Sequence, residues 1–216
     1  MTLLKPIGGG VRQRSSSTSS SSTSSDGESV HKPLENPVDV LKSVFALNAS
    51  TKAWMEQQKA VNSFCKPSEE ELGAYDLEVV RAIREGNIDN LRQMLAAGRQ
   101  FNACNRFGES LIHMACRRGD VHLVSFLLDE AHVNPEICDD FGRTPLHDAC
   151  WTSSPNLEVV GLLLKKVPPS MFLTRDVRGH TPFQYARREH WPIWVGFLRE
   201  NASVLLQRVS ILVALE

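Results

Sequence analysis

Apolar residues recur at helical spacing in several separate stretches of this chain. Val121, Val124, Leu127 and Leu128 fall on one face of a helix, so this stretch is predicted to be amphipathic. Three further sets have comparable spacing: Leu91, Met94 and Leu95; Val159, Leu162 and Leu163; and Val195, Phe197 and Leu198. The pattern therefore predicts a series of helices, each with one buried face.

A short phrase also occurs three times, each time ahead of one of these helices. It begins at Gly108, Gly142 and Gly179, which are spaced 34 and 37 positions apart. Glycine suits a turn with positive φ, and the Ser or Thr two residues later can cap the first free amides of a helix. A period of this length predicts stacked units of turn, short helix, turn and longer helix rather than one globular core.

The block Thr144-Pro-Leu-His147 resembles the ankyrin repeat. The resemblance covers about residues 74–216, although Leu111 replaces the usual proline and Gln184 replaces the usual histidine. It implies an all-α ankyrin-repeat solenoid of about four helix-turn-helix repeats with capping helices. The expected repeats are 74–105, 106–139, 140–176 and 177–202, followed by a C-terminal capping helix over 203–216.

Residues 34–73 are expected to form a helical N-terminal extension. Val38, Leu41, Val44 and Phe45 recur at helical spacing, a second candidate helix follows residue 50, and the sequence from Ser68 has the form of a capping box. Because an end repeat needs cover, we expect these helices to pack against the first repeat. The alternative is a separate docking motif.

The N-terminal 33 residues are expected to be a disordered Ser/Thr-rich tail, because they lack the apolar side chains that could offset the entropy of ordering. A solvated tail is the simpler interpretation. Basic residues precede Ser15 and Ser16, and acidic residues follow Ser25, so these three serines are candidate phosphorylation sites.

Composition narrows the class of protein. The chain has 216 residues, 42% of them hydrophobic, and a formal net charge of −1, so no long-range field attracts it to a membrane or to nucleic acid. The five cysteines are an odd number scattered along the chain, which favours a reducing compartment. We expect a cytoplasmic or nuclear protein, monomeric alone, with no membrane partner.

The sequence predicts no catalytic residue, no cofactor and no metal site. It contains no glycine-rich phosphate loop, nucleophile elbow or HExxH helix. His113 with Cys116, and His147 with Cys150, share helical faces and could each offer two metal ligands. The resemblance implies instead that the histidine hydrogen-bonds the backbone of a neighbouring loop and that the cysteine is small, buried and inert.

The resemblance also implies which positions contact a partner, namely the loop tips and the inner face of the first helix of each repeat. Aromatic residues and arginines dominate this set, and those residue types carry much interface energy. The alternative is an ordinary solvated surface with the phenylalanines packing one loop on the next. The predicted contact residues are Arg106, Phe107, Glu109, Met114, Arg117, Arg118, Asp140, Phe141, Arg143, Asp148, Trp151, Thr152, Val177, Arg178, His180, Tyr185, Arg187 and Arg188.

The sequence thus predicts a non-catalytic protein-protein interaction module, an intracellular adaptor, scaffold or inhibitor. The second hypothesis is a nucleic-acid-associated regulatory protein that uses the arginine-rich fourth repeat. Acidic residues, Asp176, Glu189 and Glu200, interleave with those arginines, so nucleic acid is the less favoured partner.

Overall fold

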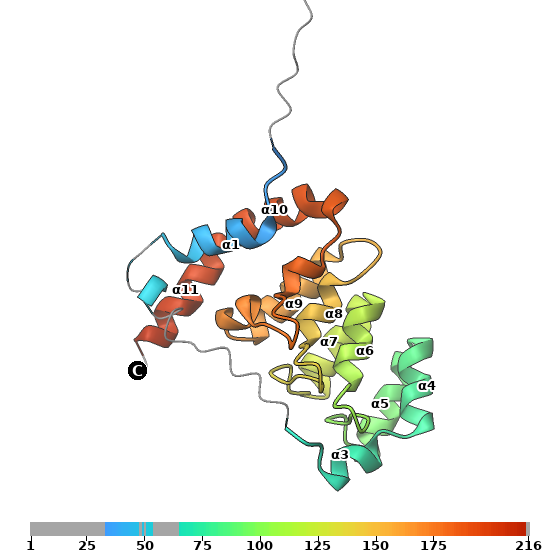
Figure 1. Cartoon of the computed structure of the whole chain (residues 1–216). Coiled ribbons are helices and arrows are strands. Elements are labelled where there is room, and N and C mark those ends of the chain that lie inside the picture. Colours follow the sequence, from blue (N-terminus) through green and yellow to red (C-terminus); the bar gives the residue numbers. More distant parts are fainter. Residues whose placement is uncertain (1–32, 48, 50, 54–64, 215–216) are drawn as a thin grey trace, which may run out of the picture. The chain divides into compact units, whose positions relative to one another are not determined.

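The computed structural model describes residues 33–47, 49, 51–53 and 65–214, and every regular element in these ranges is helical. Residues 34–216 belong to one compact domain, in which two-helix hairpins follow one another (Figure 1). The hairpin helices are α4 (Leu77–Glu85) with α5 (Ile88–Ala96), α6 (Leu111–Arg118) with α7 (Val121–Ser125) and the π-helical turn η1 (Phe126–Glu130), and α8 (Pro145–Cys150) with α9 (Leu157–Lys166).

The hairpins stack through equivalent helices. The first helices form one row in which α4 packs on α6 and α6 on α8, and α7 packs on α9 in a second row. Small residues make this approach close, since Ala115 and Ala149 are both buried where neighbouring hairpins meet. One apolar core runs through the stack as a result, as expected for units that cannot bury an apolar face alone.

The fourth unit departs from the predicted pattern. Its first helix is reduced to a 3₁₀ turn, η3 (Pro182–Tyr185), which packs on α8 and ends in extended backbone at Ala186. The indole N–H of Trp191 donates to the Ala186 carbonyl, 3.2 Å away, so that carbonyl is satisfied without a further helical turn. A second 3₁₀ turn, η4 (Arg188–His190), leads into α10 (Trp191–Glu200).

The expectation that the N-terminal extension covers the first repeat is wrong for its first helix. α1 (Pro37–Phe45) lies against α10, η3 and α11 (Ala202–Val213), at the opposite end of the stack from α3 (Glu69–Ala74) (Figure 1). Its apolar face, including Leu41, joins the common core, and Arg199 pairs with Glu35 at 2.8 Å. The segment therefore covers the C-terminal end of the array.

The other helices predicted outside the repeats have different outcomes. The capping box at Ser68 is confirmed, because it opens α3 with Glu71 at the N3 position. α11 packs on α10 and on the 3₁₀ turn η2 (Pro169–Leu173). Most of the helix predicted after residue 50 lies outside the described residues.

The three phrase glycines have the positive φ that the sequence predicts, and two of them form a matched pair for a test. Gly142 has φ +72°, and a Cβ added there would lie 3.4 Å from the Cα of Asp176 in the next loop. Gly179 has φ +79°, with no described atom within 4 Å of an added Cβ. Backbone strain is therefore similar at the two positions, whereas a close approach to the next loop occurs only at Gly142.

Gly142→Val is expected to lower the free energy of unfolding by more than Gly179→Val does. Each substitution carries the cost of a β-branched residue at positive φ, about 1–3 kcal/mol. The branched methyls at position 142 additionally meet the backbone of Asp176 and Val177. Urea unfolding of both variants measures the difference, and equal losses would show that the loop contact contributes nothing.

Candidate functional site

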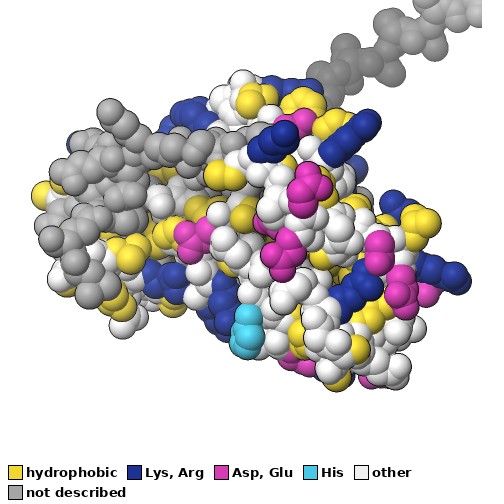
Figure 2. All heavy atoms as spheres, turned by 90° about the horizontal axis from the view of Figure 1, so that it is seen from below, with side chains coloured by type: hydrophobic (Ala, Val, Ile, Leu, Met, Phe, Trp, Pro, Cys, Tyr) yellow, Lys and Arg dark blue, Asp and Glu magenta, His cyan; other side chains and the backbone are white. Residues whose placement is uncertain are grey.

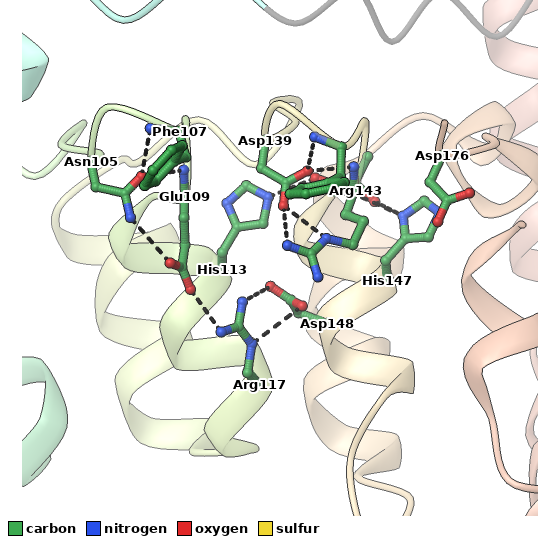
Figure 3. Close-up of polar contacts among 12 residues, drawn as sticks. Asn105, Phe107, Glu109, His113, Arg117, Asp139, Arg143, His147, Asp148 and Asp176 are labelled. Atoms are coloured by element: carbon green, nitrogen blue, oxygen red, sulfur yellow. Dashed lines mark hydrogen bonds and ion pairs between the residues drawn. The ribbon is translucent and has the colours of Figure 1, made fainter. Parts of the chain in front are cut away.

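A polar residue three positions before each phrase glycine shapes the loop tips. The Oδ1 atom of Asp139 accepts the backbone N–H groups of Phe141 (3.0 Å) and Arg143 (2.8 Å). Asn105 and Asp176 do the same in their own loops, and Figure 3 shows the three side chains at equivalent places. Our sequence analysis missed this feature, although the constant offset of Asn or Asp from the glycine was a visible signal.

The loops are also joined to one another through their backbones. The carbonyl of Phe107 accepts the N–H of Asp140 (2.8 Å), and the carbonyl of Phe141 accepts the N–H of Val177 (2.9 Å). Both phenylalanine side chains remain 48% exposed. The backbone thus connects one loop to the next, while the rings are left at the surface, with the guanidinium of Arg106 over one and that of Arg143 over the other.

The two phrase histidines are structural, as the resemblance implied. His113 occupies the N3 position of a capping box, where its Nδ1 accepts the backbone N–H of Ser110. Its Nε2 therefore carries the proton and donates to the carbonyl of Arg143, 2.9 Å away in the next loop. His147 makes the same contacts with Thr144 and with the carbonyl of His180.

The histidines and cysteines of the two candidate metal-binding pairs are engaged in the structure of the repeats. Both ring nitrogens of each histidine are occupied, and burial raises the pKa of the Cys116 and Cys150 thiols. Within residues 33–47, 49, 51–53 and 65–214, no three His, Cys, Asp or Glu side chains are grouped so as to hold a metal ion.

Stability is expected to fall as the pH drops below about 6.5, the ordinary pKa of histidine. Burial lowers the pKa of His113 and of His147 in the folded state, partly offset by the hydrogen bonds to Arg143 and His180. The unfolded chain therefore takes up these protons first, so acid favours unfolding, and the contribution is constant above the unfolded pKa. Melting temperatures at about pH 7.5 and about pH 5.5 measure the effect.

The chain itself supplies the control for this prediction. In the fourth unit Gln184 takes the place of the histidine, and its Oε1 accepts the N–H of Thr181 at 2.8 Å. The double variant His113→Gln with His147→Gln should keep the two caps but lose most of the pH dependence. An unchanged pH dependence in this variant would assign the acid sensitivity to other groups.

An ion-pair chain links the second and third units. Arg117 on α6 contacts Glu109 at 2.7 Å and Asp148 on α8 at 2.9 Å (Figure 3). Burial disfavours the charged form of Arg117, but the hydrogen bonds and charges of Asp148 and Glu109 together outweigh this effect and raise its pKa. The expectation that Asp148 is an exposed contact residue is wrong, because its side chain is 1% exposed and engaged in this pair.

A hollow of about 130 Å³ lies between the third and fourth units. We call it the aromatic hollow, because three rings contribute to its wall. Its lining residues are Phe141, Arg143, Trp151, Asp176, Val177, Arg178 and Tyr185. All but Asp176 belong to the predicted contact set, so the fold brings together six residues that lie up to 44 positions apart in the sequence.

The wall of the aromatic hollow is held in place by contacts beneath it. The hydroxyl of Tyr185 donates to Oδ2 of Asp176, and burial together with this bond raises the pKa of Tyr185 to about 12. The Trp151 and Tyr185 rings lie with centroids 6.0 Å apart. Arg143 donates to Oδ2 of Asp139 through Nε (2.8 Å) and Nη2 (2.5 Å), which fixes its guanidinium.

The remaining predicted contact residues lie outside this hollow. Met114 is half-buried against the core, while Arg118 and Asp140 are exposed on α6 and on a loop tip. Trp151 and Thr152 follow α8 rather than lying within it. His180 is exposed on a loop tip. Arg187 and Arg188 depart from the prediction, because the first helix of their unit is a 3₁₀ turn and they lie on no inner helix.

The candidate phosphorylation sites Ser15, Ser16 and Ser25 lie outside the described residues. No helix in the described part of the chain is long and apolar enough to cross a membrane.

Residues 79–176 match the family model for ankyrin repeats, in three copies. The chain carries ankyrin repeats. Ankyrin repeats typically bind other proteins and are generally non-catalytic. The match includes the first two loops, the capping histidines and α8 described above.

Several curated proteins are similar to parts of the chain. The E3 ubiquitin-protein ligase KEG of Arabidopsis thaliana is 33% identical over 96 residues, which are 40% of this chain and 6% of that protein. The SMC5-SMC6 complex localization factor protein 1 of Homo sapiens is 33% identical over 109 residues, 50% of this chain and 10% of that protein. An L-asparaginase of Dirofilaria immitis is 28% identical over 143 residues, 66% of this chain and 23% of that enzyme. The matches thus span less than a quarter of each of these three relatives.

Proposed function

We propose that this ankyrin-repeat protein is a non-catalytic adaptor, scaffold or inhibitor that binds a partner protein through the aromatic hollow. The observation that carries the proposal is the convergence of six predicted contact residues from two units on one concave surface. The Trp151 side chain is 53% exposed and that of Phe141 48% exposed, so both rings are accessible to a partner. Aromatic residues of this kind supply much of the binding energy at protein interfaces.

The proposal includes a cytoplasmic or nuclear location and a chain that is monomeric before it binds. Three of its five cysteines, Cys104, Cys116 and Cys150, are buried in the array, and an odd number of cysteines suits a reducing compartment. No activity is carried over from the asparaginase, because the match covers 23% of that enzyme.

Partner capture from a lysate of the protein's own cells tests this assignment. The wild type is compared with Phe141→Ala combined with Trp151→Ala, and bound proteins are quantified by mass spectrometry. The matched control combines Ile193→Ala with Leu77→Ala, since Ile193 is 46% exposed, close to the 48% of Phe141, and Leu77 is 88% exposed on α4. Neither control residue lines the hollow.

We expect the hollow variant to lose a stoichiometric partner that the wild type and the control retain. Equal thermal stability of the three proteins is required, because an unfolded variant would also lose binding. Recovery of the same partner in equal amount through all three proteins would contradict the groove assignment.

The nucleic-acid hypothesis gains no support from the described surface. In the fourth unit Arg187 lies 3.9 Å from Glu189, Arg188 lies over the Trp191 ring, and Arg199 is paired with Glu35. Figure 2 shows acidic and basic side chains interspersed over the described face rather than a continuous basic stripe. If the chain did bind phosphate groups, it would bind mixed DNA or RNA at low salt, and this binding would weaken steeply as salt is added.

A further inference from the structure

We propose that the aromatic hollow takes one large apolar or aromatic side chain from an acidic segment of its partner protein. This inference rests on the proposed function and specifies the chemistry of the segment that binds there. It follows from the size of the hollow, from the rigidity of its wall and from the state of the charged groups around it.

The size of the hollow suits a single side chain. Its volume is about 130 Å³, close to the engineered cavity of about 150 Å³ that accepts a benzene ring. Trp151, Tyr185 and Phe141 present rings to this space, and Val177 adds an aliphatic side chain that is largely exposed. An aromatic or long aliphatic side chain would cover these apolar surfaces, whereas a small polar one would leave them in water.

The wall is largely preorganised for such a ligand. Tyr185 is fixed by its bond to Asp176 and by edge-on contacts with the rings of His147 and His180, at centroid distances of 5.9 Å and 5.7 Å. The Phe141 backbone is fixed on both sides, by the side chain of Asp139 and by the N–H of Val177. Binding therefore costs little ordering of these residues, which favours affinity.

Asp176, which lines the hollow, and Asp139, which holds Arg143 in its wall, are already occupied. Asp176 accepts the backbone N–H groups of Arg178 and His180 through Oδ1 and the Tyr185 hydroxyl through Oδ2. Asp139 accepts backbone N–H groups and the Arg143 guanidinium in the same way. Their negative charges are thus directed into the loops and offer little to a basic partner.

One cation that lines the hollow, Arg178, is left for a partner, because Arg143 is paired with Asp139. The Arg178 side chain lines the hollow and is exposed, and its guanidinium forms no ion pair with any residue that the structure describes. The neighbouring arginines already have contacts within the chain: Arg175 donates to the carbonyl of Gly179, Arg187 lies 3.9 Å from Glu189, and Arg188 lies over the Trp191 ring. A guanidinium beside aromatic rings suits a carboxylate placed near an apolar side chain. Arg178 therefore favours an acidic segment over a basic one.

Selection from a random peptide library displayed on phage, with the full chain as bait, tests the inference without presupposing a partner. Enriched sequences are made as fluorescent peptides, and their dissociation constants are measured by anisotropy at low and at about physiological ionic strength. The baits for comparison are Trp151→Ala, Arg178→Gln and Arg178→Glu. The matched controls are Leu77→Ala and Arg84→Glu, which change an exposed apolar side chain and an exposed arginine on α4, outside the hollow and outside the predicted contact set.

We expect the enriched peptides to carry acidic residues around one aromatic or large aliphatic residue. Trp151→Ala should weaken the binding of these peptides about tenfold or more. Arg178→Glu should weaken it more than Arg178→Gln does, and the control variants should have little effect. Added salt should weaken binding, and replacement of the peptide's apolar residue by alanine should abolish it.

The outcomes separate this inference from the proposed function. Basic or neutral peptides whose binding is lost in Trp151→Ala would overturn the inference and leave the hollow as the protein-binding site. Peptides whose binding ignores all the hollow variants, or failure to enrich any peptide, would overturn both. A single-stranded DNA or RNA probe is also tested against the same variants. Tighter binding of this probe than of the peptides, lost in Arg178→Glu, would overturn the inference and identify nucleic acid as the ligand of the hollow.

Discussion

Leu146→Ala is expected to lower the free energy of unfolding by about 2–5 kcal/mol, as for other buried leucines cut back to alanine. Leu146 is 1% exposed and lies on α8, which packs on α6 on one side and on η3 on the other. Because two neighbouring units contact this helix, the space left by the side chain has little freedom to close. Urea unfolding followed by circular dichroism measures the loss.

Leu77→Ala is the matched control for this substitution. It removes the same atoms from a side chain that is 88% exposed, so a change within about 0.5 kcal/mol is expected. Each transition should also be followed by tryptophan fluorescence, because repeat arrays can unfold in parts. If Leu146→Ala unfolds at the same urea concentration as the parent, α8 does not occupy the core of the stack.

Arg117→Met is expected to destabilise the protein by about 3 kcal/mol, near the lower end of the cost of breaking a buried ion pair by removing one partner. The substitution leaves the Asp148 carboxylate buried without the guanidinium that contacts it at 2.9 Å. Methionine keeps much of the aliphatic stem of arginine, so lost packing contributes less than the unpaired charge. The measurement is again the free energy of unfolding in urea.

A double-mutant cycle identifies the origin of this loss. Arg117→Met combined with Asp148→Asn removes both charges, and we expect the combination to be less destabilising than the sum of the single changes. Glu109→Gln provides the comparison for the more exposed end of the network. Additive effects of Arg117→Met and Asp148→Asn would show that the pair contributes only packing.

The pairing of Asp148 also shows which part of the site could not be predicted from the sequence. The repeat period identified the positions on loop tips and inner helices, because each unit repeats the same local geometry. Burial of one such position depends on which side chain the neighbouring unit places opposite it. Arg117 stands opposite Asp148, and this relation between two units is absent from the pattern of either one.

The position of α1 shows the same limit at the scale of a whole helix. Its apolar spacing predicts that it packs on something, but both ends of a solenoid present an apolar face that needs cover. At the C-terminal end, Phe183, Trp194 and Phe197 form an aromatic cluster in the core that Leu41 of α1 joins. Tertiary packing, not sequence order, selects that end.

The sequence by itself determined the ankyrin-repeat class, the positive φ of the phrase glycines, the caps and the buried faces of the hairpin helices. These features depend on residues close together in the chain, whose backbone and side-chain preferences act locally. Only the tertiary structure decided that Phe141, Trp151, Arg178 and Tyr185 line one hollow, and that an N-terminal helix covers the C-terminal end. Those outcomes depend on contacts between units far apart in sequence, which a local pattern of polar and apolar residues does not encode.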